Sequence, residues 1–172
     1  MNFNYRELLP DSLDLSSRVW IYQSGRPFSP GEVLEIENML KVFVGSWNSH
    51  GVKVKGWANL FYGQFIILMA DETASGVSGC STDSSVRLMK EIEQKFQVQL
   101  FDRLLLAFLI KEKVQLLSLS QLGSAMANQH ISSESLYFNN TIQTRKELEN
   151  NWIIPLKDSW LKDRVLKLET KQ

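Results

Sequence analysis

The stretch Phe65-Ile66-Ile67-Leu68-Met69-Ala70 decides the fold, because every one of its side chains is apolar. Successive side chains of a strand point to opposite faces, so both faces of this strand are apolar. We therefore predict a central strand that is buried on both sides. Gly63 separates it from another stretch of strand type, and the two predict a hairpin of strands at 55–62 and 64–70.

The segments on either side of this hairpin predict further strands and helices. Arg18–Gln23 has apolar side chains on both faces and predicts an earlier interior strand. Ser29-Pro30-Gly31-Glu32 is typical of a capped helix start, and the apolar stripe that follows predicts a helix to about Trp47. Further elements are expected as follows: a helix capped by Thr82, Asp83 or Ser84 and ending near Gln97, strands at 104–110 and 114–119, a short helix at 121–129, a helix opened by the capping box Thr144–Glu147, and a last helix capped by Asp158.

This element order predicts an α+β fold with a ferredoxin-like β-α-β-β-α-β core, an extra strand and C-terminal helices. The length favours a single domain over residues 1–172. Residues 1–17 predict an irregular N-terminal arm, and residues 120–172 a mostly helical C-terminal extension. The alternative is a profilin-like or roadblock-like α-β-α sandwich. Four leucines of the arm are candidates to hold it against the body, namely Leu8, Leu9, Leu13 and Leu15.

Composition excludes several classes of function. Lys+Arg and Asp+Glu number 19 each, so the chain lacks the basic footprint of a nucleic-acid-binding protein. One cysteine excludes an intrachain disulfide and suits a reducing compartment. We find no signal peptide at residues 1–10 and no apolar run long enough to span a bilayer. We therefore expect a cytoplasmic protein that binds neither membranes nor nucleic acids.

The densest polar segment is the loop at 71–85, between the central strand and the second predicted helix. It holds the only cysteine, three carboxylates and seven hydroxyl side chains. One hypothesis is a cysteine nucleophile, since a thiolate is favoured near a helix N-terminus. Cys80 would then need a histidine as base, His50 or His130, and a carboxylate such as Asp83. The alternative is that Cys80 is a small structural residue beneath the loop.

Anion binding is a second hypothesis for the same loop. Free amides and hydroxyl groups at a helix N-terminus bind phosphate, sulfate or carboxylate. The candidate residues are Ser78, Gly79, Ser81, Thr82 and Arg87. The alternative is a loop whose hydroxyl groups satisfy its own backbone.

A metal site is not predicted, and neither is a cofactor. Asp71, Glu72 and Asp83 are suitable oxygen ligands, but their spacing does not match an EF-hand loop. We expect Asp83 to cap the helix instead, and Asp71 and Glu72 to end the strand in solvent.

Five tryptophans are many for this length. Trp20, Trp47, Trp57 and Trp160 fit apolar stripes and are expected in the core. Trp152 beside Pro155 favours core packing over a role as a surface anchor for a partner.

Several segments together resemble a family of uncharacterised bacterial proteins that are often labelled "ABC transporter ATPase". The resemblance covers nearly the whole chain and implies no catalytic residues. Its segments are Arg18–Gln23, Ser78–Val86, Phe101-Asp102-Arg103 and Thr144–Glu149, together with Trp152, Pro155, Ser159 and Trp160.

The ATPase label itself is not supported by the residues. A P-loop needs Gly-x-x-x-x-Gly-Lys-Ser/Thr, because its lysine reaches the terminal phosphates. No Gly-Lys pair occurs in the chain, and Gly76–Ser81 has Cys80 where that lysine would stand. The sequence therefore favours a binding or assembly module whose partner is a small anion or a protein. The alternative is a small enzyme that uses Cys80. The oligomeric state is left open.

Overall fold

The computed structural model describes residues 4–49, 51–71, 73 and 79–170. Its elements are helices and antiparallel strands, which confirms the predicted α+β class. The chain divides into two compact units. The N-terminal unit comprises residues 2–101 and 141–149, and the C-terminal unit comprises residues 102–140 and 150–172. The single domain over residues 1–172 stays a prediction.

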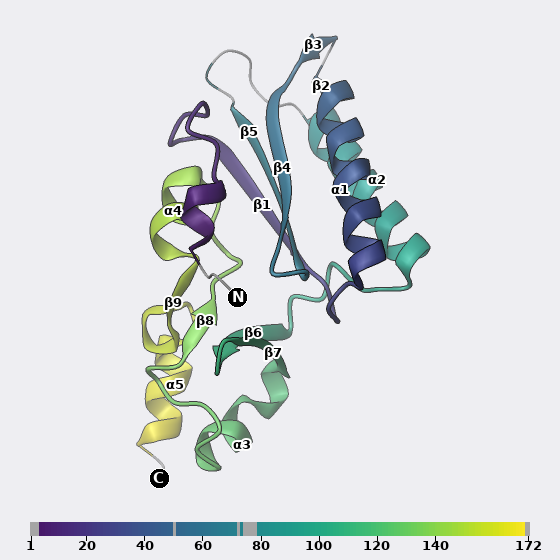
Figure 1. Cartoon of the computed structure of the whole chain (residues 1–172). Helices are drawn as coiled ribbons and strands as arrows, with labels where there is room; N and C mark the ends of the chain where they lie inside the picture. The colour runs from purple at the N-terminus through teal and green to yellow at the C-terminus, as the bar shows by residue number, and fades with distance from the viewer. Residues whose placement is uncertain (1–3, 50, 72, 74–78, 171–172) are drawn as a thin grey trace. The chain divides into compact units, whose positions relative to one another are not determined.

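The main sheet of the N-terminal unit has the strand order β1-β5-β4, with antiparallel pairing throughout (Figure 1). All side chains of β5 are buried, as predicted for the central strand. The turn between β4 and β5 needs positive φ at Tyr62 (54°) and Gly63 (62°). The strands are β1 (Arg18–Gln23), β4 (Lys55–Phe61) and β5 (Phe65–Asp71).

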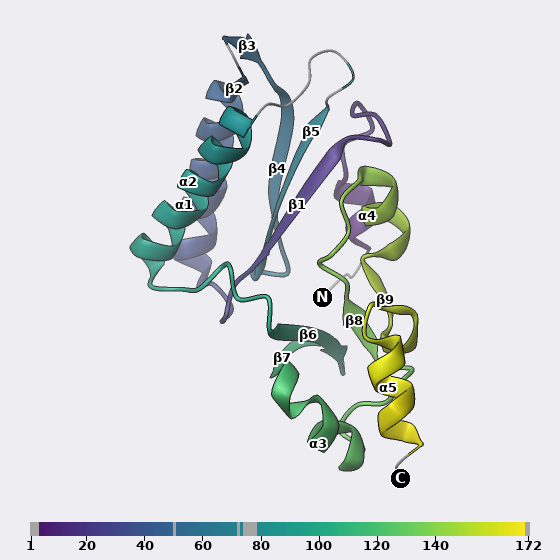
Figure 2. The same cartoon turned by 180° about the vertical axis from the view of Figure 1, so that it is seen from behind.

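Two helices, α1 (Pro30–Ser46) and α2 (Gly79–Phe96), lie side by side over one face of this sheet (Figures 1 and 2). The predicted capping box of Ser29 and Glu32 opens α1, with Pro30 in its first turn. The expected start of α2 was wrong, because the helix begins at Gly79 rather than after a cap at 82–84. The buried residues shared by the helices and the sheet include Ile36, Leu40, Ile66, Leu68, Met89 and Ile92.

The opposite face of the sheet is covered by the N-terminal arm, with η1 (Tyr5–Leu8), and by α4 (Arg145–Asn151) (Figures 1 and 2). The Tyr5 hydroxyl donates to the carbonyl of Leu148 over 2.8 Å. Of the four leucines expected to hold the arm, Leu9 and Leu13 are buried, whereas Leu8 and Leu15 are exposed.

A short antiparallel ladder of β2 (Asn48–Ser49) and β3 (Val52–Lys53) joins α1 to β4. Just beyond the ladder, the Val54 amide after β3 donates to the carbonyl of Trp47 before β2 over 2.9 Å. The end of α1 is therefore fixed against the start of β4.

The C-terminal unit contains a separate four-stranded sheet of order β7-β6-β8-β9. The turn between β6 and β7 has positive φ at Lys111 and Glu112. Its core includes Leu106, Phe108, Leu122, Met126, Tyr137 and Val165. The elements are β6 (Leu105–Ile110), β7 (Lys113–Ser118), η2 (Leu119–Gln121), α3 (Leu122–Ala127), β8 (Leu136–Phe138), β9 (Ile153–Pro155), η3 (Leu156–Asp158) and α5 (Lys162–Glu169).

The ferredoxin-like order is not confirmed. β1, β4 and β5 with α1 take the positions of a split βαβ unit. The expected fourth strand, β6, pairs instead with β7 on one edge and β8 on the other. Beside β1 lies the segment before α4, with an isolated bridge between Arg18 and Thr144. Helices cover both faces of the sheet β1-β5-β4, with α1 and α2 on one face and α4 on the other (Figures 1 and 2). This is a feature of the α-β-α sandwich given above as the alternative fold.

Two details of the C-terminal segment also differ from expectation. Residues 120–172 include β8 and β9 as well as helices, and Asp158 ends η3 instead of capping α5. Trp160 is 51% exposed rather than in the core, whereas Trp152 is fully buried as predicted.

Candidate functional site

The polar loop begins with a buried carboxylate that is already paired. Asp71 accepts hydrogen bonds from the Lys55 ammonium at 2.8 Å and from the Thr73 amide and hydroxyl at 3.0 and 2.6 Å. The Lys55 hydrogen bond, with the two from Thr73, holds the pKa of Asp71 well below its usual range. The expectation that Asp71 ends the strand in solvent was therefore wrong.

The described part of the chain does not test the proposed catalytic and anion-binding residues as a group. His50, Glu72 and Ser78 lie outside the described residues. Gly79, Cys80 and Ser81 form the start of α2, so Cys80 lies inside the helix rather than before it, and their side chains also lie outside the described part. The cysteine and anion hypotheses therefore stay predictions.

The other loop candidates belong to the first turns of α2. The carbonyl of Thr82 accepts the Ser85 hydroxyl over 2.7 Å, and Asp83 and Arg87 are exposed. His130 belongs to the C-terminal unit, where its Nε2 lies 3.2 Å from Oε1 of Gln115.

Neither a metal centre nor a membrane span is found where the structure describes the chain. Its described His, Cys, Asp and Glu residues form no group of three that could hold a metal ion. None of the helices, over the same residues, has the length and apolar character needed to cross a membrane.

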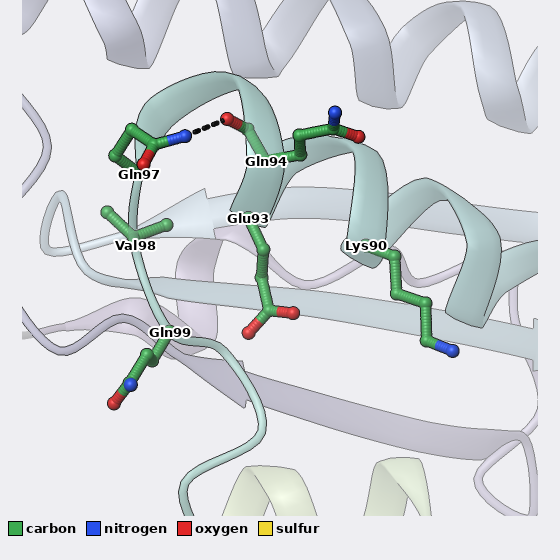
Figure 3. Close-up of a pocket in the computed structure, with 6 residues that line it drawn as sticks. All are labelled: Lys90, Glu93, Gln94, Gln97, Val98 and Gln99. Carbon is green, nitrogen blue, oxygen red and sulfur yellow. Dashed lines mark hydrogen bonds between the residues drawn. The ribbon is translucent and has the colours of Figure 1, made fainter.

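A polar hollow of about 490 Å³ lies at the C-terminal end of α2 (Figure 3). Glu93 in this hollow accepts the Leu100 amide over 2.6 Å, so its carboxylate holds the chain that leaves the helix. Gln97 likewise donates to the carbonyl of Gln94 over 2.7 Å. These contacts stabilise the end of the helix. The lining residues are Lys90, Glu93, Gln94, Gln97, Val98 and Gln99.

A second hollow, of about 230 Å³, lies between α1 and β4. Its wall on α1 carries two exposed charges, Glu37 and Lys41, one helical turn apart. Its floor on β4 is formed by small residues, Gly56 and Ala58. The groove between α1 and β4 is lined by Glu37, Leu40, Lys41, Val44, Gly56, Trp57, Ala58 and Asn59.

The groove runs along the edge of the sheet, because β5 is the one described strand that pairs with β4. The Val54 amide donates to the Trp47 carbonyl, and the Leu60 amide donates to Oδ1 of its neighbour Asn59 over 2.9 Å. Both bonds lie outside the β4–β5 ladder. Backbone groups alternate in direction along a strand, so every second residue from Val54 to Leu60 turns its amide and carbonyl away from β5. Gly56 and Ala58 are the two such residues between Val54 and Leu60.

Gly56 and Ala58 therefore present open backbone groups. Within the described residues, their outward amides and carbonyls have no hydrogen-bond partner. Unpaired groups along a strand edge are a template for another strand. In recognition by strand addition, main-chain hydrogen bonds supply affinity and neighbouring side chains supply specificity.

At Gly56 the strand β4 packs closely against the ring of Trp47, the residue that follows α1. A Cβ at this position would lie 2.6 Å from Cε3 of Trp47 and 3.0 Å from Cζ3. Trp47 is 1% exposed and packs on Phe43, with ring centroids 4.8 Å apart. The absence of a side chain at Gly56 therefore lets α1 and β4 approach each other.

Sequence reasoning missed this groove. The strand at 55–62 was expected from its apolar pattern, but that pattern does not tell an edge strand from an inner one. Gly56 was the available signal, since a glycine within a strand often marks a close approach of another backbone or a ligand.

The comparisons give no relative from which a function could be carried over. No model of a known protein family, no curated protein and no solved structure matches the chain. The resemblance to the bacterial family therefore stays a prediction, and the functional argument depends on the chain's own geometry.

Proposed function

We propose that the chain is a protein-binding module and that the groove between α1 and β4 is its binding surface. The observation that carries this proposal is the open backbone of Gly56 and Ala58 on the edge strand. A strand from a partner would satisfy these groups and cover the apolar floor of the groove.

The side chains of the groove suit recognition rather than catalysis. Glu37 and Lys41 are charged and exposed, and neither forms an ion pair within the described residues. A module of this kind with a single cysteine suits a reducing compartment, and we propose that it works in the bacterial cytoplasm.

Site-specific photo-crosslinking in living cells tests this function. A benzophenone amino acid replaces Lys41 in the groove, and in a matched control it replaces Lys90, an exposed lysine at the polar hollow of α2. We expect a discrete protein adduct from position 41 and none from position 90. Mass spectrometry identifies the protein attached.

A second substitution makes the test specific for the edge of β4. Ala58→Pro removes one outward amide and places a ring on the edge, which edge strands tolerate and added strands do not. We expect Ala58→Pro to abolish the adduct and Ala58→Ser to retain it, with circular dichroism showing that both variants are folded. An adduct that persists in folded Ala58→Pro would overturn the proposal.

A further inference from the structure

The strand that pairs with β4, we infer, is β4 of a second copy of this chain. The two strands run antiparallel about a twofold axis at Trp57 and join the two sheets into one. This inference rests on the proposed function and names its partner.

In this arrangement the open backbone groups of one copy pair with the same groups of the other copy. A twofold axis at Trp57 sets Gly56 opposite the partner's Ala58, and Ala58 opposite the partner's Gly56. Each such pair exchanges both of its amide–carbonyl hydrogen bonds. The next outward amides along the strand are Val54 and Leu60, which donate to Trp47 and Asn59 and need no partner. The open segment therefore matches the segment that the partner would present.

The charges along α1 are complementary in the same way. α1 lies beside β4, and a twofold axis makes the two copies of α1 antiparallel. Glu37 then faces the partner's Lys41, and Lys41 faces the partner's Glu37. The isologous contact uses both charges of each copy, so opposite charges meet twice and like charges are kept apart.

The axis also brings the Trp57 side chains of the two copies next to each other. Trp57 is half-buried, and its ring centroid lies 6.0 Å from that of Phe61. In the antiparallel pairing, Trp57 and the partner's Trp57 form a non-hydrogen-bonded pair, the type in which side chains are closest. Aromatic pairs at such positions stabilise neighbouring strands.

A second copy fits the edge better than a strand of an unrelated protein. An unrelated strand would have to supply opposite charges at the spacing of Glu37 and Lys41, whereas a second copy supplies them by symmetry. The chain also has a net charge of zero, so long-range repulsion does not oppose self-association.

Charge reversal combined with sedimentation equilibrium tests the inference. The wild type is compared with Glu37→Lys, Lys41→Glu and the double variant from micromolar to millimolar concentration. We expect the wild type to dimerise and each single reversal to weaken the dimer at least about tenfold, because each places like charges together twice. The double variant should recover to within about threefold of the wild type, since it restores opposite charges. Thermal unfolding monitors the fold of each variant.

Three results would overturn the inference. They are a wild type that stays monomeric, a dimer that neither single reversal affects, and a double variant as weak as the singles. The crosslinking experiment separates this failure from that of the proposed function. If the wild type is monomeric and position 41 crosslinks to a different protein in a manner that Ala58→Pro abolishes, the partner is wrong and the binding surface stands. If no adduct forms either, both fail.

Discussion

The Nζ of Lys55 lies 2.8 Å from Oδ2 of Asp71, so an ion pair joins the first residue of β4 to the last residue of β5. The Asp71 side chain is 4% exposed, whereas that of Lys55 is 55% exposed. The buried carboxylate depends on its donors, while the lysine can return to water. Asp71 therefore ties the edge strand to the central strand at the end of the sheet where the polar loop begins.

Replacement of this carboxylate should weaken the sheet. We expect Asp71→Asn to lower the free energy of unfolding at pH 7 by about 1–3 kcal/mol, because a buried acceptor loses its charge-assisted hydrogen bond. Urea denaturation measures the change. Asp163→Asn, at an exposed position of α5, is the control and should change the free energy by less than about 0.5 kcal/mol.

The same carboxylate predicts a dependence of stability on pH. The pKa of Asp71 is lower in the folded chain than its unfolded value of about 3.9. Its contribution is therefore fully present above about pH 5 and is lost as the pH falls below the unfolded pKa. Between pH 5 and 2.5 the stability of Asp71→Asn should fall less steeply than that of the wild type. Identical slopes would contradict this assignment. The carboxyl group of Glu32, whose pKa is lowered to about 2 by Arg26 and Ser29, contributes in the same direction in both proteins.

Gly56 and Gly45 give a matched pair of glycine substitutions. Gly56→Ala should destabilise the fold by about 1–3 kcal/mol, since its Cβ would clash with the buried ring of Trp47. Gly45 lies within α1, and among the described residues, apart from its chain neighbours and the adjacent helix backbone, no atom comes within 4 Å of the place that a Cβ would take there. Gly45→Ala should therefore stabilise the helix by about 0.5–1 kcal/mol. Chemical denaturation at low micromolar concentration compares the two. Equal effects of the same sign would refute this account of the groove.

Elements set by local sequence were predictable. The continuous apolar run at 65–70 predicted a central strand, and β5 is buried on both faces. Ser29 and Glu32 predicted the start of α1, because a capping box involves only neighbouring residues. Thr144 and Glu147 likewise form their predicted hydrogen bonds at the start of α4.

Features that depend on strand order were not predictable. The run at 104–110 predicted a strand but not its sheet, and β6 uses both of its edges within the C-terminal unit. The same limit concealed the groove, because β4 becomes an edge only through the order β1-β5-β4. Lys55 explains the error at Asp71, since a cation 16 residues away in the sequence pairs with a carboxylate that local sequence alone would place in solvent.

Trp152 and Trp160 should respond very differently to the same substitution. Trp152 is fully buried, packs on Phe138 at 5.5 Å between ring centroids and donates to Oδ1 of Asn140 over 3.0 Å. We expect Trp152→Phe to cost about 2–4 kcal/mol from lost packing and a lost hydrogen bond. Trp160 is half-exposed and donates to the Tyr137 hydroxyl, so Trp160→Phe should cost less than about 1 kcal/mol. Thermal and urea unfolding of both variants measure the difference, and a larger effect at Trp160 would contradict it.

Arg145 should hold the N-terminal arm against the sheet. Its guanidinium donates to the carbonyls of Leu13 and Asp11 and pairs with the Glu149 carboxylate at 2.8 Å, while the side chain is only 10% exposed. A lysine carries the charge but lacks the planar group that reaches several acceptors at once. We therefore expect Arg145→Lys to lower the free energy of unfolding by about 1–3 kcal/mol and to speed amide exchange within the arm.

The exposed neighbour of Arg145 provides the control for this last prediction. Lys146→Arg changes the adjacent side chain at an exposed position and should leave exchange in the arm unchanged. Hydrogen-exchange mass spectrometry of the peptide covering residues 9–17 gives the measurement, since the Ser17 amide donates to the carbonyl of Asp14 within it. Faster exchange in both variants would reflect a general loss of stability at α4. Faster exchange in Arg145→Lys alone is the result expected if the guanidinium itself fixes the arm, because only that substitution removes donors to the arm's backbone.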